Sequence, residues 1–185
     1  MSYAAARVNN VKRVVLLGAE STGKSTLAAA LARRYSTVWN PEYGRPYTQI
    51  GREHGTAWTS EEFTHIARIH CWYEDFLAEL AREVLFVDTD AFTTAVFHEV
   101  YLGRPATDFA DLAARGYDLF VVCGLDVPWQ HDGIREFDEQ RRTMQERYLE
   151  RASGSGSPWV LVEGSVEVRL AAAVAAVDGV LHGSG

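Results

Sequence analysis

The chain has 185 residues, of which 47% are hydrophobic and 23% charged, a composition typical of a globular domain rather than of a disordered or fibrous protein. Its formal net charge of -7 at pH 7 argues against a nucleic-acid or anionic-membrane surface, because phosphate backbones are bound by an excess of lysine and arginine. No apolar run approaches the roughly 20 residues of a membrane span, and Cys71 and Cys123 lack zinc or C-x-x-C spacing. We therefore expect one domain over residues 1–185 that works in the cytoplasm, without membrane insertion and without nucleic acid as a partner.

The first predicted strand covers residues 11–17 and ends at a complete phosphate-loop motif. The sequence from Gly18 to Ser25, GAESTGKS, satisfies the G-x-x-x-x-G-K-[ST] spacing, and a helix-prone run rich in Ala and Leu follows over residues 24–35. Glycines in such a loop let successive backbone N–H groups point at phosphate oxygens, next to the positive end of the helix dipole. We expect Lys24 to reach the β- and γ-phosphates of a nucleoside triphosphate and Ser25 to ligate Mg²⁺. Further nucleotide contacts are expected from Gly18, Ser21, Thr22, Gly23 and Thr26.

The rest of the chain alternates predicted strands and helices. Residues 41–47, with a proline at each end and a glycine inside, are expected to form a loop rather than a helix. Strands are expected over residues 36–40, 84–87, 119–123 and 159–162, and helices over about 60–83 with Ser60 as N-cap, 91–102, 107–115, 133–151 and 166–177. Five such alternations predict an α/β fold with a parallel sheet between helices, whose ligands gather at the carboxyl ends of the strands.

Charged side chains follow the second and third predicted strands. Asp88 directly follows the apolar run VLFV, where a phosphate-loop protein carries the carboxylate that holds Mg²⁺ and can act as base for an attacking hydroxyl. We expect Asp90 to contact a substrate hydroxyl, and the alternative for both residues is a helix N-cap. Glu42 and Arg45 follow the second strand and could hold a polar acceptor, although a surface ion pair is the alternative.

The polar helix after the fourth strand is a candidate lid over about residues 129–151. A lid arginine stabilises the charge that develops during phosphoryl transfer. We expect Arg135 in this role, followed by Arg141 and Arg142, and the alternative is a solvated helix laced with Glu–Arg pairs.

Aromatic and histidine side chains are the remaining candidates for the acceptor pocket. Tyr43 and Tyr47 either line the pocket or pack beside it, and His70 on the long helix belongs to the pocket or the core. One aromatic ring is expected to stack on the substrate base, and the candidates are Trp39, Trp58, Trp72, Tyr73 and Trp129.

Four segments, in this order, resemble a known family. They are GAESTGKST, PEYGRPY, VDTDAFTT and VPWQHDGIRE, and together they resemble the ribosylnicotinamide kinase domain of bacterial bifunctional NAD-biosynthesis regulators over about residues 11–180. The resemblance implies a three-layer P-loop fold with strand order 2-3-1-4-5 and a helical lid. It also implies transfer of the ATP γ-phosphate, with Mg²⁺, to the 5′-hydroxyl of nicotinamide riboside, which gives nicotinamide mononucleotide.

The resemblance also implies roles for individual residues. It places five side chains around the acceptor and in the lid: Glu42, Arg45, Asp88 and Asp90 at the nucleoside and Arg135 in the lid. Relatives often have an aromatic residue immediately before the glutamate, where this chain has Pro41, so Tyr73 becomes the preferred stacking partner. Two alternatives stay open, a kinase for another nucleoside or small hydroxylated metabolite, and a regulatory module that binds or slowly hydrolyses ATP.

Overall fold

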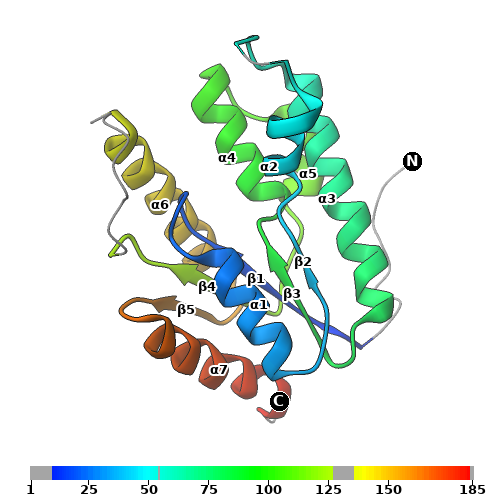
Figure 1. Cartoon of the computed structure of the whole chain (residues 1–185), viewed down its shortest axis with the longest axis vertical. Coiled ribbons are helices and arrows are strands. Elements are labelled where there is room, and N and C mark those ends of the chain that lie inside the picture. Colours follow the sequence, from blue (N-terminus) through cyan, green and yellow to red (C-terminus); the bar gives the residue numbers. More distant parts are fainter. Residues whose placement is uncertain (1–9, 54, 127–135, 184–185) are drawn as a thin grey trace.

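The fold has three layers, with a five-stranded sheet between two layers of helices (Figure 1). The computed structural model describes residues 10–53, 55–126 and 136–183. All strand pairs are parallel, in the order β2-β3-β1-β4-β5, which confirms the expected fold class and strand order. The strands are β1 (Lys12–Leu17), β2 (Trp39–Asn40), β3 (Val84–Asp88), β4 (Leu119–Cys123) and β5 (Trp159–Val162).

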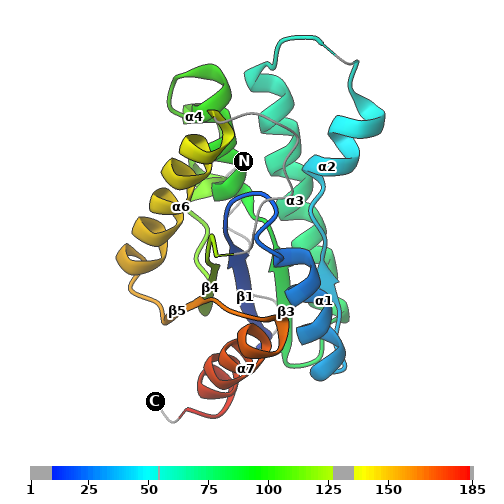
Figure 2. The ribbon, with the colours of Figure 1, turned by 60° about the vertical axis from the view of Figure 1, so that its left-hand side comes forward.

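Helices cover both faces of the sheet (Figure 2). They are α1 (Lys24–Arg34), α2 (Gly44–Pro46), α3 (Ser60–Leu80), α4 (Ala91–Leu102), α5 (Ala110–Ala113), α6 (Glu136–Gly154) and α7 (Val166–His182), with a π-helical turn at Tyr47–Gly51 and a 3-10 turn at Thr107–Phe109. Helices α1 and α7 pack on one face, and α3, α4 and α6 pack on the other. No helix in these described ranges is long and apolar enough to cross a membrane.

Strand β1 shows why the sheet needs helices on both sides. Its side chains alternate between the two faces, as strand geometry requires. Val14 and Leu16 join the core beneath α1 and α7, whereas Val15 and Leu17 join the core beneath α3, α4 and α6. Since all four are fully buried, β1 is the central strand, and the loop that follows it leaves from the middle of the sheet edge.

Several local predictions differ from the structure: the strand expected over residues 36–40 is only Trp39–Asn40, the helix expected over 107–115 is divided into a 3-10 turn and α5, and the last helix continues to His182. Two further differences lie near the site. The expected loop over residues 41–47 contains the helical turn α2, which leads into the π-helical turn; Pro46 is tolerated because a first-turn residue has no helical N–H bond to lose. The N-cap of α3 is Thr59 rather than Ser60: Thr59 Oγ1 accepts from the Glu62 N–H at 3.3 Å, and the Thr59 N–H donates to Glu62 Oε2 at 2.9 Å. This reciprocal capping box satisfies two backbone donors.

A buried ion-pair network fastens α3 to the sheet. The Glu74 carboxylate, with 1% of the residue exposed, lies 2.6 Å from Arg13 Nη1 and 3.2 Å from Arg115 Nη1. The Tyr117 hydroxyl donates to its other oxygen at 3.1 Å. Because these partners come from β1 and from the segment before β4, the network sets the position of α3, which carries part of the site described below.

Candidate functional site

The phosphate loop lies between β1 and α1, at the carboxyl end of the central strand. Gly18 has φ 151°, and a Cβ there would lie 2.8 Å from Thr22 Oγ1 and 2.9 Å from the Cys123 carbonyl oxygen. Only glycine fits this close approach. Gly23, with φ 84°, stands at the N-cap of α1, so the loop turns directly into the helix whose N-terminus attracts anions.

Side chains of the loop divide between supporting it and facing outward. The Lys24 ammonium group donates to the carbonyl oxygens of Gly18 and Ala19 at 2.8 and 2.9 Å, so it curls over the loop. The buried Thr22 hydroxyl donates to the Ala19 carbonyl at 2.8 Å and therefore braces the loop from inside. Ser25 and Thr26 are exposed in the first turn of α1.

Arg169 on α7 also holds the phosphate loop, and sequence reasoning missed it. Its guanidinium donates to the Thr22 carbonyl at 2.8 Å and to the Gly164 carbonyl at 3.0 Å, and it pairs with the Asp126 carboxylate. The side chain is almost fully buried. Nothing in the local sequence marks this arginine, because its partners lie up to 147 positions away.

Asp88 ends β3, and β1 residue Leu16 is its partner in the sheet register. The residue is 0% exposed, and neither carboxylate oxygen has a hydrogen-bond partner among the described residues. Burial raises the pKa of the carboxyl group, while the Ser25 hydroxyl and the Lys24 ammonium group act in the opposite direction. Oxygen ligands of this kind suit Mg²⁺, which binds through one or two carboxylates together with phosphate oxygens. Ser25 and Asp88 therefore fit the residues expected to hold the metal.

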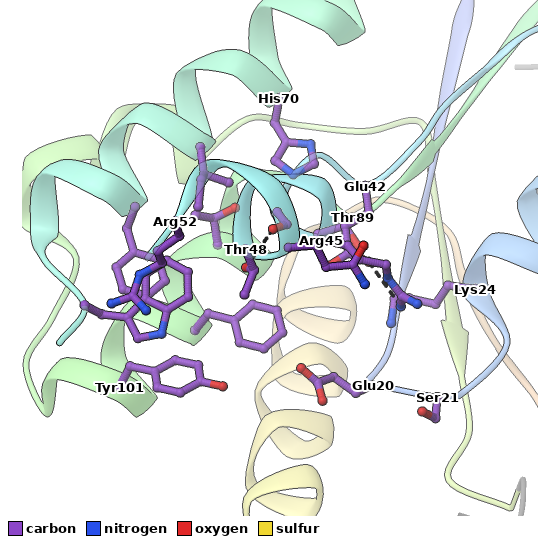
Figure 3. Close-up of a pocket in the computed structure, with 17 residues that line it drawn as sticks. Glu20, Ser21, Lys24, Glu42, Arg45, Thr48, Arg52, His70, Thr89 and Tyr101 are labelled. Carbon is purple, nitrogen blue, oxygen red and sulfur yellow. Dashed lines mark hydrogen bonds and ion pairs between the residues drawn. The ribbon is translucent and has the colours of Figure 1, made fainter. Parts of the chain in front are cut away.

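A cavity of about 430 Å³ opens beside the phosphate loop, within the range of roughly 300–1,000 Å³ typical of small-molecule sites. Ser21 and Lys24 lie at one end, and Arg52 and Tyr101 lie at the other (Figure 3). The aromatic end also contains Trp58, Phe63 and Phe97. The Arg52 guanidinium lies 4.1 Å from the centre of the Trp58 ring, a cation–π contact.

Glu42 and Arg45 both line this cavity. The carboxylate and the guanidinium lie 3.6 Å apart, and the Arg45 side chain is 65% exposed. The pKa of Glu42 is raised, mainly by burial. The Lys24 ammonium group opposes this shift, and the Asp88 carboxylate adds to it. The structure thus brings the acid and arginine after β2 to the same edge as the phosphate loop, and they also form the ion pair weighed as the alternative.

Other predicted residues lie outside the cavity lining. Asp90 is buried and caps α4, where its carboxylate accepts from the Thr93 N–H and hydroxyl, both at 2.9 Å. Its neighbour Thr89, with φ 72°, lines the cavity instead. Tyr73 packs against Trp72 and Phe76 along α3.

Tyr43 also lies beside the cavity rather than in its lining. Its hydroxyl and His65 Nε2 are 3.3 Å apart. Trp129 and Arg135 fall outside the described residues.

The candidate lid is packed into the core over much of its described length. Arg141, Met144 and Tyr148 on α6 are buried, and Gln145 Nε2 donates to the Cys123 carbonyl at 3.1 Å. Arg142 is exposed. One side of the helix from Arg141 onward therefore packs against the fold, and the lid over about residues 129–151 stays a prediction.

Comparisons with known proteins show the family of the chain. A family model described as an AAA domain matches residues 13–169. The chain belongs to the AAA domain family. It is 34% identical over 158 residues to the trifunctional NAD biosynthesis/regulator protein NadR of Escherichia coli (strain K12). The aligned segment covers 83% of this chain and 38% of that protein. The chain thus spans well under half the length of that relative.

Solved structures show the same fold. The NadR protein in complex with NR superposes with a TM-score of 0.77 at 24% identity, covering 96% of this chain and 54% of that one. Thymidylate kinase from Candida albicans superposes with a TM-score of 0.63 at 12% identity, covering 91% of each chain. These likenesses establish a P-loop kinase fold, and with the E. coli relative they confirm the resemblance indicated by the four sequence segments.

Proposed function

We propose that this chain is an ATP- and Mg²⁺-dependent kinase that transfers the γ-phosphate to the 5′-hydroxyl of nicotinamide riboside and so makes nicotinamide mononucleotide. One observation carries the proposal: Lys24 belongs to the phosphate loop and also lines the acceptor cavity. A phosphate on the loop and a nucleoside in the cavity would therefore meet at the same side chain. The likeness to a trifunctional NAD biosynthesis/regulator protein supports the choice of nucleoside.

The proposed phosphoryl transfer uses residues on both sides of that meeting point. Lys24 would leave the loop carbonyls for the β- and γ-phosphates, and Ser25 and Asp88 would hold Mg²⁺, which would supply positive charge to neutralise the phosphates. The acceptor hydroxyl oxygen attacks the γ-phosphorus, the bond to the β–γ bridging oxygen breaks, and ADP leaves. Asp88, whose carboxylate oxygens have no partner among the described residues, would hold the metal and is also the residue to which we assign the hydroxyl proton.

The chemistry of the cavity suits a nucleoside with a flat, positively charged base. The nicotinamide ring of the riboside is a pyridinium cation, and aromatic faces attract cations. The Trp58 ring contacts the Arg52 guanidinium at 4.1 Å and stacks on Phe63 at 4.8 Å, so it is already covered within the protein. Tyr101, at the same end of the cavity, is exposed instead. We propose that Tyr101 stacks on the base in place of Tyr73, and that Glu42 binds the sugar.

The lid belongs to the same proposal. The resemblance gives Arg135 the role of the arginine that covers the transferring phosphate, and Trp129 lies in the same lid. Closure of such a segment would exclude water, which otherwise accepts the phosphate.

The experiment is a nucleoside panel with purified protein, ATP and Mg²⁺, followed by chromatography of the nucleotide products. Nicotinamide mononucleotide should form in preference to the monophosphates of adenosine, cytidine, uridine and thymidine. Turnover of another nucleoside without turnover of nicotinamide riboside would refute the substrate. ATP hydrolysis that no nucleoside changes would favour the regulatory module over the kinase.

A further inference from the structure

His70 has an unusual environment for a histidine inside a protein. It lies on α3, is 2% exposed and lines the cavity. Neither Nδ1 nor Nε2 has a hydrogen-bond partner among the described residues. Buried polar atoms are almost always hydrogen-bonded, so the two nitrogens require an explanation.

A purely structural histidine in this same protein looks different. His98 is 0% exposed, and both of its ring nitrogens have partners. Nε2 lies 2.5 Å from the Ser60 hydroxyl, and Nδ1 lies 3.1 Å from the Arg104 carbonyl oxygen. Both nitrogens of His98 thus have partners within the fold, whereas the two buried nitrogens of His70, a residue that lines the cavity, have none among the described residues.

The charge state of His70 defines what it can bind. Burial lowers the pKa of the imidazole to about 4, so the ring is neutral at physiological pH. A neutral imidazole has one N–H donor and one acceptor nitrogen. Each ring nitrogen takes its own partner, and a hydroxyl suits either of them, because it can accept from the N–H or donate to the other nitrogen.

The position of His70 selects which part of a ligand it meets. Its ring points from α3 toward the segment that carries Glu42 and Arg45, rather than toward Tyr101 at the aromatic end (Figure 3). The Tyr43 ring packs edge-on against it, with centroids 6.4 Å apart, and this contact restricts the orientation of the imidazole. The sugar of a nucleoside belongs at this end, because its 5′-hydroxyl must reach the phosphate loop.

We propose that His70 hydrogen-bonds a ribose hydroxyl of the acceptor and makes the enzyme prefer ribosides to deoxyribosides. This inference rests on the proposed function, because it takes the cavity as a nucleoside site. A site built to pair with a hydroxyl rejects the analogue that lacks it, since the buried polar group is then left without a partner.

The test combines variants of the protein with variants of the substrate. The kcat/KM values of wild type and His70→Phe are measured for a riboside and for its 2′-deoxy and 3′-deoxy forms. Wild type should prefer the riboside to one of the deoxy forms by roughly tenfold to hundredfold, and His70→Phe should reduce this preference to within about threefold. His70→Asn, which keeps a donor and an acceptor, should retain part of it. His65→Phe, on an exposed residue of the same helix, is the matched control and should keep the wild-type preference.

The outcomes separate this inference from the proposed function. An unchanged preference in His70→Phe, or an equal loss for all three substrates in a variant with wild-type circular dichroism, overturns the inference. If the panel shows a different nucleoside as substrate, the identity of the acceptor is wrong, and the same comparison proceeds with that nucleoside. If nucleosides bind without phosphate transfer, the proposed function fails, and the comparison uses dissociation constants from calorimetry. If no nucleoside binds, the inference is overturned with it.

Discussion

Replacing Asp88 by asparagine should stabilise the protein while it removes its activity. The carboxylate is 0% exposed and neither oxygen has a partner in the described part of the chain. A buried polar group without partners costs about 1–3 kcal/mol, and the cost is larger for a charged group than for a neutral amide. We therefore expect Asp88→Asn to raise the free energy of unfolding by about 1 kcal/mol, or by about 2–4 °C in Tm for a chain of this size.

The pH dependence gives the sign of this effect independently. Burial raises the pKa of Asp88 in the folded protein above its value in the unfolded chain. The protonated form is therefore favoured by folding, and its contribution to stability is fully present below the unfolded pKa of about 4 and is lost as pH rises through the folded pKa. The stability advantage of Asp88→Asn should accordingly be absent at low pH and grow as pH rises.

The assay is urea unfolding of both proteins at several pH values without nucleotide, beside a kinase assay with ATP and Mg²⁺. Turnover of the variant should fall by orders of magnitude. A neutral amide lacks the negative charge that attracts Mg²⁺ and cannot accept the proton of the attacking hydroxyl. If the free energy of unfolding of the variant at neutral pH is lower than that of wild type by more than about 1 kcal/mol, the buried Asp88 carboxylate does not destabilise the fold and the reasoning is refuted. Near-normal turnover would refute its catalytic role.

Three further predictions follow from single contacts. Lys24→Ala should abolish turnover with little change in Tm, because the hydrogen bonds of Lys24 in the described part of the chain go to two loop carbonyls; a large drop in Tm would show that the ammonium group holds the loop together. Glu74→Ala should cost about 1–3 kcal/mol of unfolding free energy in urea titrations, because the buried Tyr117 hydroxyl loses its partner and Arg13 and Arg115 keep only Asp75 among the described carboxylates. Glu79→Ala, exposed on the same helix, should cost under about 0.5 kcal/mol. Gly18→Ala should cost about 1–3 kcal/mol, since its Cβ would meet backbone and side-chain oxygens within 3 Å; calorimetry showing no loss would mean that the loop relaxes freely.

Much of the site edge could be predicted because it depends on local sequence. The phosphate loop is continuous in the chain, and Asp88 directly follows an apolar strand, so strand order alone brings them together at one edge. Glu42 follows the neighbouring strand and lines the same cavity for the same reason. These predictions required only that parallel strands end together.

Residues on helices were harder to place. Tyr73 and His70 lie three positions apart on α3, yet only His70 lines the cavity, because the rotation of the helix about its axis is set by packing against α4, α5 and the sheet. Asp90 and Thr89 are adjacent, and the unusual backbone of Thr89 at φ 72° accompanies the turn that sends Asp90 into the α4 cap and leaves Thr89 at the cavity. Such choices depend on contacts between distant segments, which no local pattern records.

The sequence by itself determined the phosphate loop, the alternation of strands and helices, and the carboxylates that follow β2 and β3, since these depend on neighbouring residues and on the two-residue and 3.6-residue periods. Only the tertiary structure decided which side chains enclose the acceptor. Segments far apart in the chain form the aromatic end of the cavity and the contact of Arg169 with the phosphate loop. They also surround His70, whose ring nitrogens have no partner among the described residues. Their positions follow from how helices pack on the sheet, a property of the whole fold.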